Sequence, residues 1–433
     1  MQEVPGVSIA APSGHARGAI AIARGLVLQF SPGFWKFFAA AFFFDFGIGL
    51  YFFLFNLFLT DLHFDEKTLG LITGALTLGN VAGTIPAMIL ARRFGLKRLL
   101  LFSLIAVPFL CMLRTFLLWP VAQIVLALLT GVALCSWPIC FSPMIANLTN
   151  ERNRVAGFSV AFATGIGLGS LAGLTGGYLP GLLQKAGHAG SVVEPIRFVL
   201  LLACGVILLG IFPILSLQSA HPEGSRSGRF RLFHPFLFWF LPAFAVWSIV
   251  TGSFPPFAAV YLQKHLGLPL HYVGVIFSAS QLVQFGAVLL APLLYRKIGT
   301  VYGIACAQLA TGLTLFAMAG ARVSLLPVAC YLGYTGMQWM GGPGIYSFLM
   351  EHIPEEERST ASAIQNISGA LCQAAAAAIT GNCIVRFGYP AVLFGNGGAA
   401  LLAALLFVVL LGSASWVKRP ALFSSVPETN LET

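Results

Sequence analysis

The chain alternates long apolar stretches with short polar ones over almost its whole length. Apolar stretches of about 20 residues, each long enough as a helix to cross about 30 Å of hydrocarbon, recur twelve times. The predicted spans are residues 35–59, 69–90, 98–117, 120–147, 155–184, 197–217, 235–263, 272–295, 301–319, 325–350, 358–385 and 391–413. Strands of a β-barrel are shorter, about ten residues, and alternate in polarity. The pattern therefore predicts an all-α integral membrane protein with twelve transmembrane helices.

Composition and charge support this reading. The chain is 58% hydrophobic and 9% charged, with a mean hydropathy of +0.88, whereas a soluble domain has about 25% charged residues. If both termini are cytoplasmic, 17 of the 24 Lys and Arg residues fall on the inner side, as the positive-inside rule requires. The formal net charge of +10 is then explained by topology, and no nucleic-acid partner is expected. The first 30 residues lack the compact apolar region of a signal peptide.

Several chemistries have no sequence support. The eight cysteines lie within predicted helices without CxxC or CxxH spacing, so we expect packing residues and no metal site or cofactor. A GxxxxGK[ST] loop is absent, which disfavours ATP-driven pumping. Every histidine lies at a helix boundary, so no membrane-embedded Ser/His pair is available for hydrolysis. We therefore expect a protein that is not an enzyme.

The sequence also repeats itself. Residues 69–95 align without gaps to residues 273–299, an offset of 204, and the same offset aligns Arg154 with Arg358. Parallel six-helix repeats are the plan of transporters whose halves rock around a central site. We expect two pseudo-symmetric six-helix halves. The predicted division is a cytoplasmic N-terminal segment 1–34, a first half 35–217, a cytoplasmic linker 218–234, a second half 235–413 and a cytoplasmic tail 414–433.

The loop ARRFGLKR, residues 91–98, resembles the D-R-x-G-R-K/R loop of the major facilitator superfamily, although Arg92 replaces the aspartate. The second copy, RKIGTVYG at residues 296–303, keeps Lys297 and Gly299, and the loops NERNR and PEEERSTASA resemble the acidic and basic turns after helices 4 and 10. The resemblance implies a monomeric, multi-pass transporter that works by alternating access, with both termini cytoplasmic, here in a bacterial inner (plasma) membrane. The residues assigned to its cytoplasmic gate are Arg92, Arg93, Gly95, Lys97, Arg98, Arg154, Lys297, Gly299 and Arg358.

One carboxylate stands inside an apolar span. Asp45, in FFFDFGIGL, lies ten residues after Trp35, which is about 15 Å along a helix. The other 13 of the 14 acidic residues lie at helix ends, in loops or in tails. A central Asp costs ~2.5–3.5 kcal/mol to insert, so such residues usually mark ion, proton or substrate sites. We predict that Asp45 couples transport to protons or binds a cation; the alternative is a structural carboxyl group bonded to a neighbouring helix.

Uncharged polar and aromatic residues supply candidates for a substrate cavity. They are Tyr51, Asn80, Trp137, Trp247, Thr251, Gln281, Gln284, Tyr334, Gln338, Gln365 and Asn366. The same side chains could instead make interhelical hydrogen bonds. Arg114, near the outer end of the third span, is expected to snorkel to the interface. With no cation near mid-membrane, multivalent anions are disfavoured as substrates.

The leading hypothesis is a proton-coupled secondary transporter of a small neutral or cationic organic solute. Its other expected partner is the lipid bilayer, and export is the favoured direction of transport. Two features favour efflux: Gly165 to Gly177 resemble the glycine-rich helix 5 motif of family exporters, and no PESPR-like turn follows helix 6. A proton-coupled symporter that takes up a neutral nutrient such as a sugar is the alternative. A non-transporting membrane sensor or scaffold is a third reading, and a transport assay separates it from the other two.

Overall fold

A computed structural model describes residues 30–150, 153–186, 193–217, 235–321, 325–354 and 357–412. The first 29 residues, the linker 218–234 and the tail 414–433 lie outside the described residues, so the predictions made for them have no structural counterpart here. Within the described residues all regular elements are helical. They are α2 (Pro32–Asp61), α3 (Glu66–Phe94), α4 (Leu96–Phe116), α5 (Pro120–Leu134), α6 (Ser136–Leu148), α7 (Arg154–Lys185), α8 (Val193–Leu209), α9 (Ile211–Leu215), α10 (Pro235–Ser253), η1 (Pro255–Phe257), α11 (Ala258–Val260), η2 (Tyr261–His265), α12 (Leu270–Ile298), α13 (Thr300–Gly320), α14 (Leu325–His352) and α15 (Arg358–Leu411).

These elements account for the twelve predicted spans. Seven spans are single helices: α2, α3, α4, α7, α12, α13 and α14. The fourth span is α5 with α6, the sixth is α8 with α9, and the seventh runs from α10 through η2, because the two prolines at 255 and 256 interrupt the helix. The last two spans are the 54-residue α15, divided at Gly388, where φ is 78°. By length and composition alone, ten helices of the described part could cross a membrane, with 360–411 counted once and α14 left out.

The helix bounds repeat at the offset found in the sequence. Residue 66 begins α3 and residue 270 begins α12; residue 96 begins α4 and residue 300 begins α13. Between each pair stands a glycine with positive φ, 84° at Gly95 and 87° at Gly299. Glycine is required there because other residues rarely adopt this conformation. The two glycines of the resemblance are therefore the chain reversals between the second and third spans of each half.

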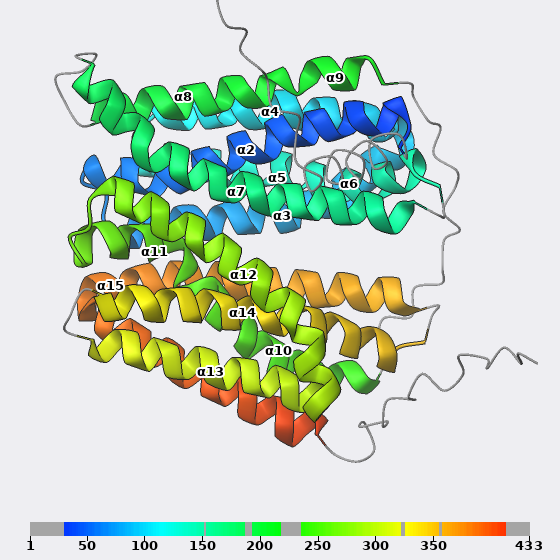
Figure 1. Cartoon of the computed structure of the whole chain (residues 1–433), viewed down its shortest axis with the longest axis vertical. Helices are drawn as coiled ribbons and strands as arrows, with labels where there is room; N and C mark the ends of the chain where they lie inside the picture. Colours follow the sequence, from blue (N-terminus) through cyan, green and yellow to red (C-terminus); the bar gives the residue numbers. More distant parts are fainter. Residues whose placement is uncertain are drawn as a thin grey trace, which may run out of the picture.

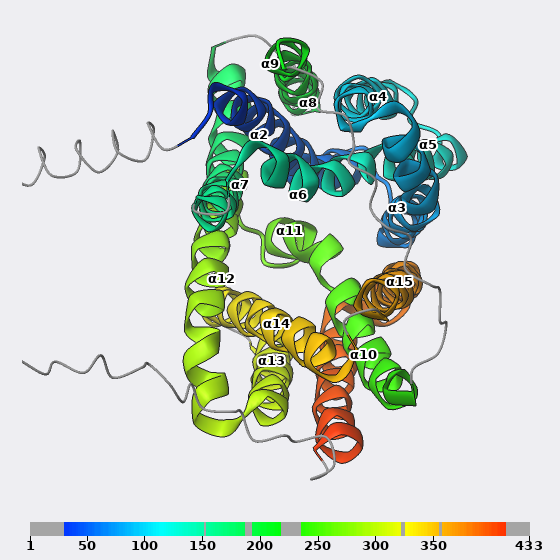
Figure 2. The same ribbon diagram turned by 90° about the vertical axis from the view of Figure 1, so that its right-hand side faces the viewer.

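Figure 1 shows two layers, with α2 to α9 in one and α10 to α15 in the other. Each layer has its own apolar core: Leu100, Ile145 and Ile207 are fully buried in the first, and Phe240 and Phe407 in the second. Seen end-on in Figure 2, α7 lies over α12 on one side and α3 over α15 on the other, and these pairs pack directly. The two halves are thus joined through two helix pairs.

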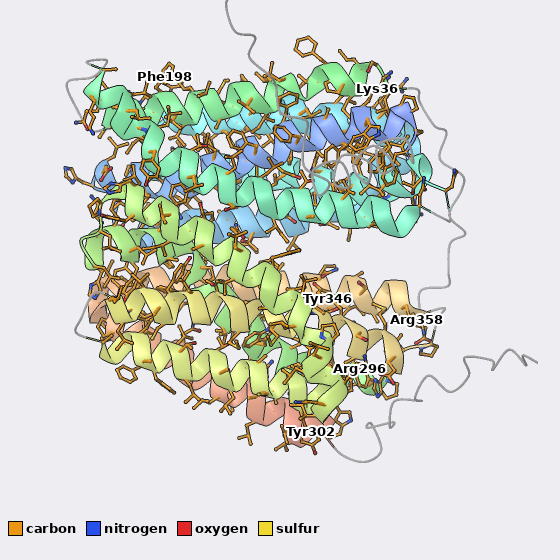
Figure 3. All side chains as sticks on the ribbon, viewed as in Figure 1. Lys36, Phe198, Arg296, Tyr302, Tyr346 and Arg358 are labelled. Atoms are coloured by element: carbon orange, nitrogen blue, oxygen red, sulfur yellow. The ribbon has the colours of Figure 1, made fainter. Side chains whose placement is uncertain are left out.

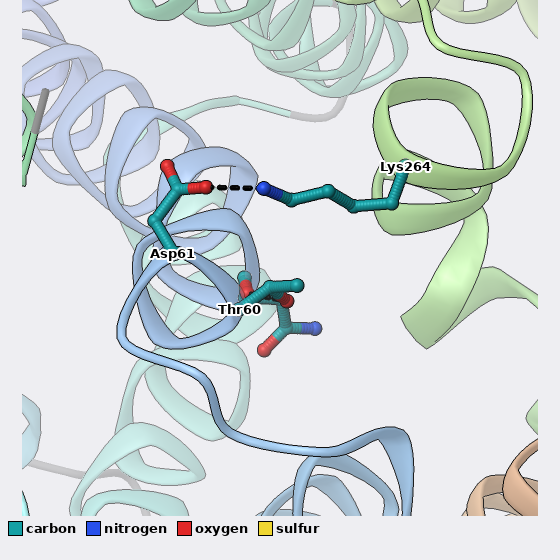
Figure 4. Close-up of polar contacts among 4 residues, drawn as sticks. Thr60, Asp61 and Lys264 are labelled. Carbon is teal, nitrogen blue, oxygen red and sulfur yellow. Dashed lines mark hydrogen bonds and ion pairs between the residues drawn. The ribbon is translucent and has the colours of Figure 1, made fainter.

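The joins lie toward one end of the helices, which we name the joined end. There Lys264 Nζ, on η2, lies 2.6 Å from Asp61 Oδ1, on α2 (Figure 4), and Asn56 Nδ2 donates to Pro256 O at 2.8 Å. The opposite end carries Lys36, Arg296 and Arg358 (Figure 3), and we name it the basic end. The two ends of the molecule therefore differ in how the halves meet.

Candidate functional site

Asp45 lies near the middle of α2, the fourteenth of its 30 residues, and is half-buried. Gly165, on α7, faces it: a Cβ atom built on this glycine would lie 3.9 Å from Asp45 Oδ2. The indole of Trp137, on α6, lies beside the carboxyl group. The carboxyl group is therefore surrounded by three helices of the first half and is still partly accessible.

Aromatic packing fixes the position of Trp137. Its ring stacks on Phe44 with centroids 3.9 Å apart and planes at 16°, and on Phe37 at 6.2 Å. Trp137 is 5% exposed and Phe44 is 2% exposed. Since Phe44 precedes Asp45 on α2, this stack sets the distance between α6 and α2 beside the carboxyl group. The position of the indole N–H relative to Asp45 is thus determined by packing.

Along the helix axes, the two halves begin to separate at the depth of Asp45. From the joined end inward, a Cβ on Gly177 would meet Gly274, a Cβ on Gly173 would meet Ser278, and a Cβ on Gly169 would meet the side chain of Gln281. One helical turn further, the same test at Gly165 finds only Asp45 within 4 Å among the described residues outside its own helix. Asp45 therefore lies at the inner limit of the joined region, next to the start of the separation between halves.

Polar residues of the second half lie at or just beyond this level. Gln281 contacts α7 at Gly169, and Gln284, one turn further along α12, is half-buried. Asn366, on α15, is exposed, and its Oδ1 accepts from Tyr346 Oη at 3.5 Å. Asn80, on α3, is half-buried, and the offset of 204 relates it to Gln284. Of the predicted residues, Asp45 and Gln281 thus lie where the halves begin to part, Trp137 is buried in the first half beside Asp45, and Asn80, Gln284 and Asn366 are at least partly exposed.

Other predicted cavity residues lie elsewhere. Tyr51 is fully buried in the first half and donates to Cys111 O at 2.9 Å. Tyr334 (1% exposed), Trp247 (4%) and Gln365 (0%) are buried within the second half. Helical periodicity turns these side chains into the core of their own half in this conformation, and their assignment to a substrate cavity stays a prediction.

Two further predicted residues have intermediate positions. Thr251 Oγ1 accepts from Gln373 Nε2 at 3.4 Å, which places it between α10 and α15, inside the second half. Gln338 is buried at 9% exposure on α14. Both fit the alternative reading of interhelical hydrogen bonding or packing better than the cavity reading.

Two basic residues of the expected gate, Lys97 and Arg358, cap helices of their own half. Lys97 Nζ donates to Leu215 O at 2.9 Å and also to Leu217 O, at the carboxyl end of α9. Arg358 Nε donates to Met350 O at 3.0 Å and to Ile353 O at 3.3 Å, at the end of α14. Cations at helix carboxyl ends are stabilised by the helix dipole. Arg92, Arg93, Arg98 and Lys297 are exposed, and the side chain of Arg154 lies outside the described residues.

The prediction for Arg114 is wrong. This side chain is 1% exposed rather than directed to the interface, and its guanidinium carbon lies 4.2 Å from the centre of the Phe55 ring. The chain also holds contacts that the sequence did not single out, including the Asp61–Lys264 ion pair and the reciprocal bonds in which the hydroxyls of Ser170 and Ser278 each donate to the other's backbone carbonyl. Such pairs join distant spans, and no local sequence signal links them. Within the described residues no three His, Cys, Asp or Glu side chains are grouped as metal ligands.

Known proteins share this architecture. A family model described as the Major Facilitator Superfamily matches residues 37–377. No curated protein matches the chain. The fold is similar to the nucleoside transporter NupG, with TM-score 0.72, 13% identity and coverage of 88% of this chain and 100% of that one. It is also similar to a D-xylose-proton symporter (TM-score 0.69, 15% identity, 87% and 96% covered) and to the inward-open xylose transporter XylE from E. coli (0.62, 14%, 87% and 94%).

Proposed function

This chain belongs to the Major Facilitator Superfamily and is a multi-pass membrane transporter rather than an enzyme, and we propose that it is a proton-coupled secondary transporter of a small neutral or cationic organic solute. The position of Asp45 carries this proposal. It is a half-buried carboxyl group in mid-helix, at the level where the halves part. Such a group can take up a proton from one side of the membrane and release it to the other as water access alternates.

The repeat argues that the carboxyl group serves function rather than folding. The offset of 204 relates Asp45 to Ile249, so the equivalent helix of the second half folds with an apolar residue at this position. A polar group inside a membrane span is costly, and one that the fold does not require is retained for another reason. Proton coupling or pairing with a cationic substrate supplies that reason.

Orientation follows from charge. Basic loops face the cytoplasm in membrane proteins, so we assign the basic end, and with it both termini, to the cytoplasm of a bacterial inner membrane. The joined end then faces outward, and the conformation described above is open toward the cytoplasm. Transport requires the reverse state, in which α7 parts from α12 and α3 from α15 at the joined end while the basic end closes.

The class of solute is inferred from the polar surfaces, and the direction of transport from the sequence. Amides at Asn80, Gln281 and Gln284, with the single carboxyl group of Asp45, suit a neutral polar or cationic molecule. We propose export, because no PESPR-like turn follows the sixth span. The glycines of α7 lend this no support, since their contacts with α12 give them a packing role.

Uptake of a neutral nutrient by proton symport is the second candidate. The half-buried amides of α12 at Gln281 and Gln284 favour it, and a D-xylose-proton symporter and a nucleoside transporter are among the proteins of similar fold. Flux measured in both directions across vesicles of known orientation separates the two candidates.

The experiment begins with a thermal-shift screen of the purified protein against sugars, nucleosides, amino acids, organic cations and lipophilic compounds. A ligand at ~100 times its dissociation constant stabilises the fold by ~2.7 kcal/mol. The ligand found is then followed in proteoliposomes with an imposed pH gradient, for the natural protein, Asp45→Asn and the control Asp65→Asn, whose carboxylate is exposed. We expect Asp45→Asn to lose accumulation against a gradient and Asp65→Asn to keep it. Undiminished accumulation by Asp45→Asn would rule out the coupling role.

A further inference from the structure

Arg114 is a fully buried cation. It lies on α4, two residues from the helix end at the joined end, and is 1% exposed. Among the described residues, Arg114 is the only charged side chain that is buried to this degree. Its guanidinium carbon lies 4.2 Å from the Phe55 ring centre on α2. Removal of a guanidinium from water is unfavourable unless its charge is compensated.

The protein compensates this charge only in part. Arg114 Nε donates to Gln123 Oε1, on α5, at a long 3.4 Å, while Nη1 is buried with no protein acceptor among the described residues. The hydroxyl of the neighbouring Tyr51 donates to Cys111 O at 2.9 Å and does not accept from Arg114 Nη1. Asp61–Lys264 is the only ion pair among the described residues. No carboxylate of the described part therefore neutralises Arg114. The undescribed stretches 187–192 and 322–324, which connect elements at this end, contain no Asp or Glu.

The fold does not require a cation at this position. Because α4 and α13 have matching bounds at the offset of 204, Arg114 corresponds to Met318, which is 2% exposed. The second half therefore fills the equivalent site with an apolar side chain of similar length. Replacing buried charges with apolar residues is often neutral or stabilising, so a cation kept here indicates a binding partner.

A second arginine adds to the positive potential. Arg197, on α8, has its guanidinium carbon 5.7 Å from the ring centre of Phe58, and its Nε is also buried without a protein acceptor in the described part. The rings of Phe55 and Phe58 are 6.4 Å apart on α2. Two guanidinium groups thus lie against neighbouring aromatic residues of one helix, and neither forms an ion pair with a carboxylate of the described residues.

We propose that the Arg114 guanidinium binds a small inorganic anion of the halide type, held between α2, α4 and α5 near the joined end. The anion accepts from Nη1 and completes the charge balance. Because Arg114 is 1% exposed, a lipid phosphate with its attached glycerol does not reach the guanidinium, and the anion we propose is therefore monatomic. The bound anion links three helices of the first half, and this proposal is independent of the transport function proposed above.

The test compares thermal stability of the purified full-length protein in sodium chloride, sodium bromide and sodium gluconate at one ionic strength. We expect a saturable rise in Tm with chloride or bromide and none with gluconate. Arg114→Met introduces the residue that the second half uses and should abolish the saturable response. Arg386→Met, which removes an exposed arginine of α15, should leave that response unchanged and so controls for surface salt effects.

A direct measurement on the natural protein keeps the proposal testable even if Arg114→Met does not fold. Crystals soaked in bromide should show an anomalous peak within hydrogen-bonding distance of the Arg114 guanidinium. A water molecule at that position with no anomalous signal would overturn the proposal. So would a halide response that is the same in the natural protein and in Arg114→Met.

Discussion

The crossing of α7 and α12 at the joined end depends on glycine, and it gives the sharpest structural prediction. A Cβ atom at position 274 would lie 2.4 Å from Gly173 O and 2.7 Å from Gly177 Cα. Both are backbone atoms, so no side-chain rotation relieves the clash. An ordinary contact needs about 1 Å more, and the two helices must separate by about that amount. Gly274→Ala is therefore expected to destabilise the joined state selectively.

Overpacking of this kind typically costs ~1–3 kcal/mol. At ~1.4 kcal/mol per factor of ten, the ratio of joined to parted molecules should fall by ~5-fold to ~150-fold. Hydrogen exchange measured by mass spectrometry reports this change, because parting exposes the joined end to water. We expect faster exchange in peptides covering residues 169–177 and 270–278, and slower exchange in peptides at the basic end.

Gly286→Ala is the matched control. Gly286 lies on the same helix, and a Cβ there would meet nothing within 4 Å. If Gly274→Ala and Gly286→Ala exchange alike at both ends, the crossing at Gly274 does not limit opening, and the assignment of the joined end as a part that moves is refuted.

Three further predictions concern polar contacts. Asp61→Asn and Lys264→Gln should each weaken the joined end by ~0.2–1 kcal/mol, and a double-mutant cycle followed by hydrogen exchange should show coupling that high salt removes. Asp65→Ala should lower stability by about 1 kcal/mol, because Asp65 Oδ1 accepts from Thr68 N at the start of α3. Hydrogen bonding to Thr68 also lowers the pKa of Asp65, so this contribution should be present above the unfolded value of about 3.9 and be lost as pH falls through the folded value; equal Tm differences between natural protein and mutant at pH 7 and at pH 3 would contradict it. Lys97→Met should lower Tm by removing the cap on α9, while removal of an exposed neighbouring arginine should not.

The twelve spans, the repeat and the two glycine reversals were predictable from sequence because each has a local signature. Apolar length identifies a span, and a fixed offset identifies a repeat without any knowledge of contacts. The offset of 204 reappears as matching bounds of α3 with α12 and of α4 with α13. The element α15 contains both of the last two predicted spans, which meet at a kink at Gly388, where φ is 78°.

Side-chain direction was less predictable. Tyr51 and Asp45 lie six residues apart on one helix, yet Tyr51 is fully buried among α2 and α4 while Asp45 is half-buried beside α7. A span that is apolar on all sides carries no amphipathic signal to separate its two faces. Arg114 illustrates the same difficulty, since proximity to a helix end suggested the interface, whereas tertiary packing against Phe55 buries it.

The most direct test of the central claim compares proton-driven transport by the natural protein and by Asp45→Asn in vesicles. The ligand found by thermal shift would be followed in proteoliposomes under an imposed pH gradient, with proton movement recorded by an internal pH dye. We predict that the natural protein couples solute movement to proton movement, and that Asp45→Asn carries out exchange of solute without net proton flux. Proton flux at the natural rate in Asp45→Asn, coupled to accumulation of the solute, would contradict the account.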